Sequence, residues 1–231
     1  MNEYSRNLGL QGLEFYDVYS IDEPSLLEFI PRPVYALLLV FPSNEAHHAH
    51  TKLEDSDQTL YGSFNPDNLT PGSVVWYKQT IPNACGTMGL LHAFSNIDSQ
   101  FIQTDSLLDK IISAAKSSKT VKDRINLLES STELRNSHQS SAIEGQSNAP
   151  NAKDKVGLHY LCMVAAKDSV DGKRKLYDLD GDRAGPIVRA ELDDNEDLLS
   201  DKALENVRRF VGREKESGNL EFALVALAPQ M

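Results

Sequence analysis

Cysteine is scarce in this sequence, and long apolar runs are missing. The chain holds two cysteines, Cys85 and Cys162, whose spacing matches no metal-binding motif. We therefore expect two free thiols rather than a disulfide framework. The longest apolar runs, such as Val34–Phe41, are far shorter than the roughly 20 residues that cross a membrane. No basic stretch followed by an apolar run opens the sequence, so we predict a cytoplasmic protein without a secretory signal.

Basic residues are also in short supply. Lys and Arg total 23 against 34 Asp and Glu, which gives a net charge of −11. Proteins that bind nucleic acid need a basic surface, so nucleic acid is not an expected partner. The densest acidic run, Glu191–Asp197, is interpreted as a solvated loop or helix start. Attraction of a basic partner is the alternative for that run.

What is present fits one ordinary globular domain. Apolar residues make up 40% and charged residues 25% of the 231 residues, which allows a core without metals or disulfides. We predict a single monomeric domain over residues 1–231. β-branched and aromatic runs predict strands at 16–20, 34–41, 74–78, 158–166, 175–180, 186–189 and 221–228. Helical signals predict helices at 22–30, 84–96, 104–116, 121–135 and 198–215. The mixture predicts an α+β fold with a largely antiparallel sheet late in the chain.

Two stretches show no periodicity. Residues 43–72 are rich in Ser, Asn, Asp, Pro and Gly, which predicts a long loop. Three histidines fall in it without acidic or cysteine ligands at a recognisable spacing, so no metal site is expected; they are His47, His48 and His50. Residues 136–157 form the second stretch. A structureless segment of that length within a compact domain is often a lid.

The segment from Gln79 to His92 carries the strongest chemical signal. Asn83 is a suitable N-cap, which places Cys85 in the first turn of the expected helix. Free N–H groups and the helix dipole favour an anion there, so the thiol should have a lowered pKa and act as a nucleophile. Gly86 would keep the approach to the sulfur open. Taken alone, Cys85 would more often be interpreted as a small buried helix residue, because free cysteine is often buried.

A nucleophile also needs an oxyanion donor and a base. Gln79 lies six residues before Cys85, and its amide could stabilise an oxyanion together with the Cys85 backbone N–H. His92 follows Cys85 by seven residues, which is about 10 Å along a helix axis and too far for direct proton transfer. We therefore interpret His92 as a packing residue.

His159 opens one expected strand, and Asp180 ends the next. A symmetric hairpin would place the two residues opposite each other, with Cβ atoms roughly 5 Å apart. Asp180 could then hold the imidazole tautomer while the other ring nitrogen faces the cysteine. Asp178 shares that face by alternation and is the rival carboxylate. Cys162 should point to the opposite face and belong to the core.

These residues resemble the active-site segments of the ubiquitin C-terminal hydrolases, a family of cysteine peptidases. The resemblance lies in Asn-Ala-Cys-Gly-Thr with an upstream Gln, in Leu-His-Tyr and in Leu-Asp-Gly, in that order. It implies Gln79 as oxyanion donor, Cys85 as nucleophile, His159 as general base and acid, and Asp180 as the orienting carboxylate. Because Leu-Asp-Gly is the family's form, it favours Asp180 over Asp178. Weaker matches extend over nearly the whole chain, at 15–20, 31–34, 144–146 and 222–227.

The resemblance also implies a fold and a substrate. The fold would be an α/β/α sandwich around a six-stranded, mainly antiparallel sheet with a papain-like active site, and residues 136–157 would be the crossover loop. The activity would be removal of small adducts or short extensions from the C-terminal glycine of ubiquitin, or of NEDD8, without a cofactor. Two alternatives are a cysteine acyltransferase or general peptidase with the same triad, and a catalytically silent ubiquitin- or NEDD8-binding module.

Overall fold

A six-stranded sheet organises the computed structural model, which describes residues 1–137, 157–216, 218 and 221–231. The strands are β1 (Leu13–Asp17), β2 (Ala36–Pro42), β3 (Leu158–Lys167), β4 (Arg174–Leu179), β5 (Ile187–Glu191) and β6 (Ala223–Pro229). Their spatial order is β1-β6-β2-β3-β4-β5, and every neighbouring pair is antiparallel. The first and last strands of the chain therefore lie side by side at one edge.

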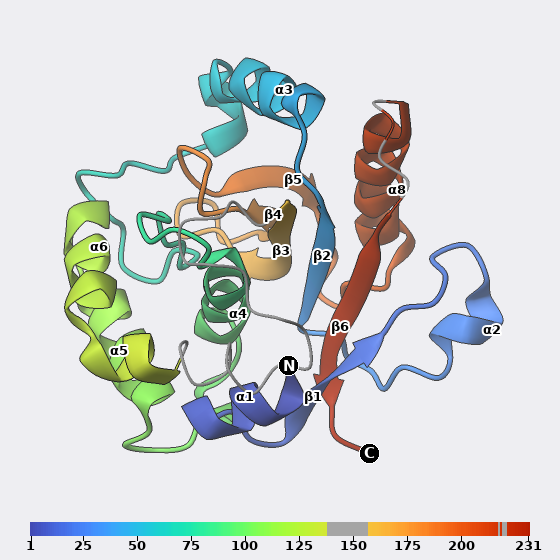
Figure 1. Cartoon of the computed structure of the whole chain (residues 1–231). Coiled ribbons are helices and arrows are strands. Elements are labelled where there is room, and N and C mark those ends of the chain that lie inside the picture. Colours follow the sequence, from blue (N-terminus) through green and yellow to red (C-terminus); the bar gives the residue numbers. More distant parts are fainter. Residues whose placement is uncertain (138–156, 217, 219–220) are drawn as a thin grey trace.

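Helices cover both faces of the sheet. They are α1 (Asn2–Leu8), α2 (Pro24–Leu27), α3 (Glu45–Asp55), η1 (Gln58–Tyr61), α4 (Cys85–Ser95), η2 (Ser99–Phe101), α5 (Leu107–Ser117), α6 (Val121–Ser130) and α8 (Asp201–Glu216). Figure 1 shows α4, α5 and α6 on one side of the sheet and α8 on the other. The predicted α/β/α sandwich is confirmed. None of the helices within the described part of the chain combines the length and apolarity that a membrane crossing requires.

Alternation along the strands divides the core into two layers. On β2 and β3, Leu38 and Cys162 belong to the apolar cluster beneath α4, and both are 0% exposed. Their strand neighbours Leu39 and Met163 belong to the cluster against α8. Cys162 is thus a free core cysteine, as expected. A thiol in that position is fully buried and is not accessible to a substrate.

The predicted long loop over residues 43–72 is wrong, because it contains α3 and η1. The polar composition hid a capped helix. The Asn44 side chain accepts from the backbone N–H of His47 at 2.8 Å and so begins α3. The ring of His47 then packs against Phe41 with 4.8 Å between centroids. This contact fixes α3 over the end of β2.

The predicted strand at 74–78 is also wrong, because this segment pairs with no strand in the part of the chain that the structure describes. Side chains of α4 and of its C-cap residue bond the backbone of this segment in place of a neighbouring strand. The N–H of Val75 donates to Asn96 Oδ1 at 2.8 Å, and that of Tyr77 donates to His92 Nε2 at 3.0 Å. His92 is 1% exposed, and burial lowers its pKa to about 4. The expected packing role of His92 is confirmed.

Candidate active site

Cys85 is the first residue of α4, one position after the cap. The predicted cap at Asn83 is wrong. Ala84 occupies the cap position without a side-chain bond, and Asn83 adopts a left-handed conformation with φ 57°. Asn tolerates that conformation better than most residues. At this start of the helix, the N–H groups of Gly86 and Cys85 act on the sulfur and favour its charged form.

The predicted lowering of the Cys85 pKa is wrong in this arrangement. Burial raises the pKa of the thiol, the nearby carboxylates of Asp182 and Asp180 raise it further, and the Gly86 N–H only partly opposes them. The sulfur donates to the carbonyl oxygen of Leu158 at 3.7 Å. A contact with a neutral carbonyl favours the protonated thiol, in line with the raised pKa.

α4 packs closely against β3, and the Cys85 sulfur lies against the start of that strand. Gly89 lies against the strand, where an added Cβ would be 3.3 Å from Leu38 and 3.5 Å from Tyr160. A Cβ added at Gly86 would lie 3.6 Å from the Tyr160 ring, which is an ordinary van der Waals contact. The Cys85 sulfur contacts the carbonyl of Leu158, the residue that immediately precedes His159 on β3.

His159 and Asp180 are brought together. Nε2 of His159 lies 2.9 Å from Oδ1 of Asp180, and the residues are 7% and 5% exposed. Oδ1 of Asp180 also accepts from the Asp182 backbone N–H at 2.9 Å. β4 ends at Leu179, so Asp180 belongs to the turn after the strand, where its side chain is not bound to the strand's alternation.

The hairpin register that led to this pair is nevertheless wrong by two residues. Cys162 pairs with Leu179, whereas the symmetric hairpin predicted residue 177. The turn is centred further along because Asp168 Oδ1 accepts from the N–H groups of Val170 and Asp171 at 2.9 and 3.3 Å. The His159–Asp180 contact forms despite the shift, because Asp180 lies beyond the paired residues.

Charge and burial oppose each other at the imidazole. Burial disfavours its charged form, but the Asp180 carboxylate outweighs it and the pKa of His159 is raised. The pKa of Asp180 is lowered, because His159 opposes the effect of burial there. Oδ2 of Asp182 lies 3.9 Å from Nδ1, on the other side of the ring. His159, Asp180 and Asp182 each place a possible metal-ligand atom within 4.8 Å of the others.

Gln79 shares a scaffold with Asp180. Its backbone N–H donates to the Gly181 carbonyl at 2.9 Å, and Trp76 Nε1 donates to the Asp180 carbonyl at 2.9 Å. Lys78 adds a bond to the Asp182 carbonyl at 2.8 Å. A Cβ on Gly181 would lie 2.8 Å from the Gln79 Cβ, so only glycine permits this approach. The segment before Cys85 is thereby fixed onto the Asp180 turn.

The rival carboxylate, Asp178, serves a different set of partners. Its oxygens accept from Arg189 Nε at 2.6 Å and from Asn206 Nδ2 on α8 at 2.9 Å. Arg189 also pairs with Glu54 of α3 at 2.8 Å, and Glu54 pairs with Arg183 at 2.9 Å. We call these residues the Asp178 network. It joins β4, β5, α3 and α8 and leaves Asp178 committed.

The sequence did not reveal that α3 also supports the imidazole. The ring of His47 lies 5.9 Å from that of His159, and Phe41 lies 5.6 Å from it. Nδ1 of His47 lies 3.1 Å from Glu214 Oε1 on α8. The sequence signal that could have predicted α3 is Asn44 as an N-cap, followed by three residues compatible with a helix.

Known proteins resemble this chain over its length. The model of the family described as ubiquitin carboxyl-terminal hydrolase, family 1, matches residues 1–212. Ubiquitin carboxyl-terminal hydrolase 3 of Arabidopsis thaliana is 33% identical, with 99% of this chain and 89% of the relative covered. Ubiquitin carboxyl-terminal hydrolase YUH1 of Saccharomyces cerevisiae is 30% identical, with 98% and 90% covered.

A solved structure confirms the fold independently of sequence. The UCH37 catalytic domain of Trichinella spiralis, bound to ubiquitin vinyl methyl ester, superposes with a TM-score of 0.71 at 18% identity. The match covers 100% of this chain and 91% of that one. The order of the candidate residues, the sandwich fold and the family match agree: this chain belongs to the cysteine-type ubiquitin carboxyl-terminal hydrolases of family 1.

Proposed function

We propose that this protein hydrolyses bonds at the C-terminal glycine of ubiquitin, with Cys85 as nucleophile, His159 as general base and acid, and Asp180 orienting His159. The observation that carries the proposal is that Cys85 lies against the start of β3, the strand that holds His159, which pairs with Asp180. The Cys85 sulfur lies 3.7 Å from the carbonyl of Leu158, next in sequence to His159. The His159 ring in turn lies 2.9 Å from Asp180. Acyl transfer by a cysteine enzyme requires a nucleophile, a general base and a carboxylate that orients the base.

The proposed reaction begins with loss of the Cys85 proton, because only the thiolate is a strong nucleophile. The proton must pass from the sulfur to His159, whose raised pKa makes it a better acceptor than an ordinary imidazole. The thiolate attacks the glycine carbonyl, and the oxyanion accepts from the Gln79 amide and the Cys85 N–H. His159 then protonates the leaving group, and an activated water releases ubiquitin from the thioester. None of these steps calls for a cofactor.

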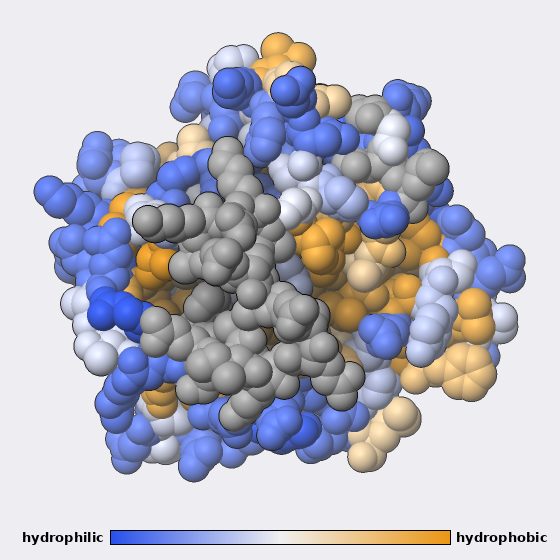
Figure 2. All heavy atoms as spheres, viewed as in Figure 1, coloured by the Kyte–Doolittle hydropathy of each residue, from blue (hydrophilic) through white to orange (hydrophobic). Residues whose placement is uncertain are grey.

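A protein substrate suits the surface. Figure 2 shows apolar side chains gathered over β6 and towards α2. Among the described residues, Tyr19 is 81% exposed and Phe29 is 74% exposed. Large exposed apolar side chains of this kind favour a macromolecular partner. The names of the relatives, and the ubiquitin ester held by the Trichinella domain, support ubiquitin as that partner.

The leaving group we propose is a small adduct or a short extension. This rests on the crossover loop assigned to residues 136–157, most of which lies outside the described residues. A closed strap before His159 would admit a thin glycine tail and exclude a folded leaving group. NEDD8 is a second possible substrate, and we propose that the enzyme acts as a cytoplasmic monomer.

Hydrolysis of ubiquitin carrying a C-terminal fluorogenic amide tests the proposal. We expect turnover by the wild type and none by Cys85→Ala, with di-ubiquitin cleaved slowly or not at all. The same amide on NEDD8 measures preference, and a short peptide amide tests for a general peptidase. Release from the peptide at a rate equal to that from ubiquitin would contradict the proposed substrate. Equal rates on the amide and di-ubiquitin would contradict the leaving-group proposal alone.

A further inference from the structure

A groove with basic walls lies at the opposite end of β3 from the candidate active site. His159 and Lys167 lie near the two ends of this strand. Eight residues of strand span roughly 26 Å. The groove has a volume of about 540 Å³. We call it the basic groove, after its charged lining residues Lys116, Lys119, Arg124, Lys167, Arg174 and Asp98.

The charge of the groove opposes that of the chain. The whole protein carries −11, yet Asp98 is the one carboxylate against five basic side chains in the groove lining. Within the described part of the chain, the ammonium groups of Lys116, Lys119 and Lys167 take part in no salt bridge. All three residues are exposed. Their charges are therefore available to an anionic ligand.

Arg124 places a further positive charge in the groove wall. It is 3% exposed, and it donates to the carbonyls of Ala115 at 3.1 Å and Trp76 at 2.9 Å. No carboxylate pairs with it among the residues that the structure describes. Burial lowers its pKa, although a guanidinium stays charged at neutral pH. Two carbonyl dipoles compensate such a charge only in part, so an anion in the groove would be stabilised.

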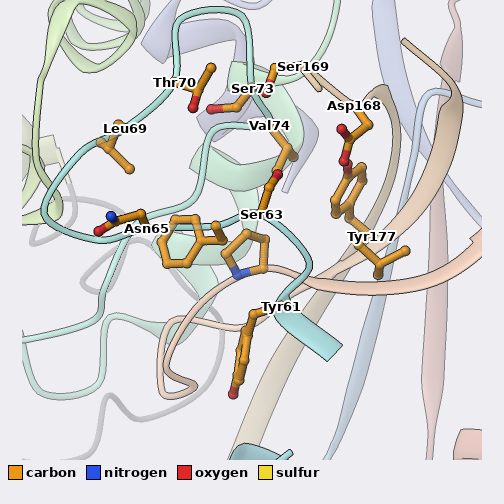
Figure 3. Close-up of a pocket in the computed structure, with 13 residues that line it drawn as sticks. Tyr61, Ser63, Asn65, Leu69, Thr70, Ser73, Val74, Asp168, Ser169 and Tyr177 are labelled. Carbon is orange, nitrogen blue, oxygen red and sulfur yellow. The ribbon is translucent and has the colours of Figure 1, made fainter. Parts of the chain in front are cut away.

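The acidic neighbours of the groove do not cancel this charge. Segment 69–74 separates the groove from a smaller cavity, and Figure 3 shows Asp168 and Tyr177 on the far side of that cavity. Asp168 accepts from Tyr177 at 3.1 Å and lies 3.1 Å from the Lys175 ammonium. The charge of Asp168 is therefore already paired, on the other side of segment 69–74 from the groove.

The shape of the charge distribution selects the ligand. Lys116 lies in the last turn of α5, Lys119 lies before α6, and Lys167 and Arg174 flank the turn of the β3–β4 hairpin. The charges thus come from separate elements around the groove, whose lining also includes Tyr35, Val74 and Ile97. A single small anion needs donors that converge on one point. An extended chain with several carboxylates and intervening apolar side chains matches distributed charges better.

We propose that the basic groove binds an acidic peptide segment of a partner protein, independently of the candidate active site. The two sites would then be occupied together, with the partner held at one end of the sheet while the other end carries out hydrolysis.

Fluorescence anisotropy with a labelled peptide tests this. The probe is an eight-residue peptide alternating Glu and Leu, and the reference peptide has Lys in place of Glu. The groove variant combines three exposed lysines of the lining, K116E/K119E/K167E. The matched control makes the same charge change at exposed lysines outside the groove, K52E/K110E/K122E.

We expect the acidic peptide to bind the wild type, with an affinity that falls as salt rises. The groove variant should lose at least tenfold in affinity, and the control variant much less. Ubiquitin-amide hydrolysis should be unchanged in both variants, which reports folding and tests the proposed function separately. Equal losses in the two variants, binding of the Lys peptide with equal affinity, or failure of the wild type to bind would overturn the proposal. Saturable binding of inorganic phosphate in place of the peptide would also overturn it.

Discussion

Two aspartates on either side of the end of β4 illustrate how position decides chemistry. Asp178 and Asp180 are both buried, at 4% and 5% exposed. Asp178 is paired within the sheet and bonds Arg189 and Asn206, which fixes neighbouring elements. Asp180 lies one residue past the strand and contacts His159 at 2.9 Å. The same carboxylate therefore serves stability in one place and the candidate chemistry in the other.

This difference depends on the partner rather than on residue type or burial. The partner of Asp178 is a permanent cation with a second carboxylate, Glu54, behind it. The partner of Asp180 is a titratable ring whose raised pKa reports the pairing. Substitutions of Cys85, His159 or Asp180 should therefore lower turnover with little effect on stability. Changes in the Asp178 network should do the reverse.

The largest expected effect is at Cys85. Cys85→Ala should abolish hydrolysis of the ubiquitin amide while leaving ubiquitin binding nearly unchanged, because the sulfur alone is removed. The control is Cys162→Ala, which changes the other free thiol in the core. That variant should keep most of its activity in the protein that remains folded. An active Cys85→Ala, or an inactive and well-folded Cys162→Ala, would contradict the assignment.

The next effect separates the two aspartates directly. Asp180→Asn should lower kcat by about 10²- to 10⁴-fold, because the imidazole loses the group that holds its tautomer. Asp178→Asn should keep most of the activity but lose about 2 kcal/mol of stability, since Arg189 loses a charged partner. Steady-state kinetics and thermal unfolding of both variants make the comparison. The reversed pattern would assign the orienting role to Asp178.

A smaller effect is expected at Gly181, which lies where the Gln79 segment contacts the turn that carries Asp180. Gly181→Ala places a methyl group 2.8 Å from the Gln79 Cβ. The Gln79 segment must then shift, which should reduce kcat by up to about 10²-fold, as expected when an oxyanion donor is displaced. Gly212→Ala in α8 is the control, because nothing lies within 4 Å of an added Cβ there and the position has no positive φ. Equal kinetics for Gly181→Ala and wild type would argue against Gln79 as a donor.

The smallest effect is a shift in a titration curve. In a Cys85→Ala background, the His159 pKa should lie above its ordinary value and fall when Asp180 becomes Asn, because burial then acts with less opposition. The stabilisation from this pair should be complete below about pH 6.5 and be lost as pH rises through the folded-state pKa. NMR titration of the imidazole measures it. An unchanged pKa in Asp180→Asn would show that Asp180 does not control the ring.

Much of the sandwich could be predicted from local patterns, and the exceptions have clear causes. The apolar helix around Cys85 and the apolar strand before residue 42 carry strong signals of their own. α3 was missed because its cap at Asn44 lies in a polar stretch that resembles a loop. Segment 74–78 resembles a strand in sequence because β-branched and aromatic residues fill its first four positions. Its backbone groups instead bond to side chains of distant residues, which no local pattern contains.

The candidate site shows the same division between local and distant information. Motif order predicts Gln79, Cys85, His159 and Asp180 as the site residues, and that assignment stays a prediction. The hairpin geometry is wrong by two residues, because Asp168 shifts the turn. The raised pKa of Cys85 could not be foreseen either. Its cause is burial together with carboxylates that approach from the turn after β4.

The most direct test of the account is covalent capture by ubiquitin bearing a C-terminal electrophile. Peptide mapping by mass spectrometry should locate one ubiquitin adduct on Cys85 and none on Cys162. Labelling should be slower in Asp180→Asn and absent in Cys85→Ala, while Asp178→Asn should label at nearly the wild-type rate. An adduct on Cys162, or no adduct with folded wild-type protein, would contradict the assignment of this site to ubiquitin hydrolysis.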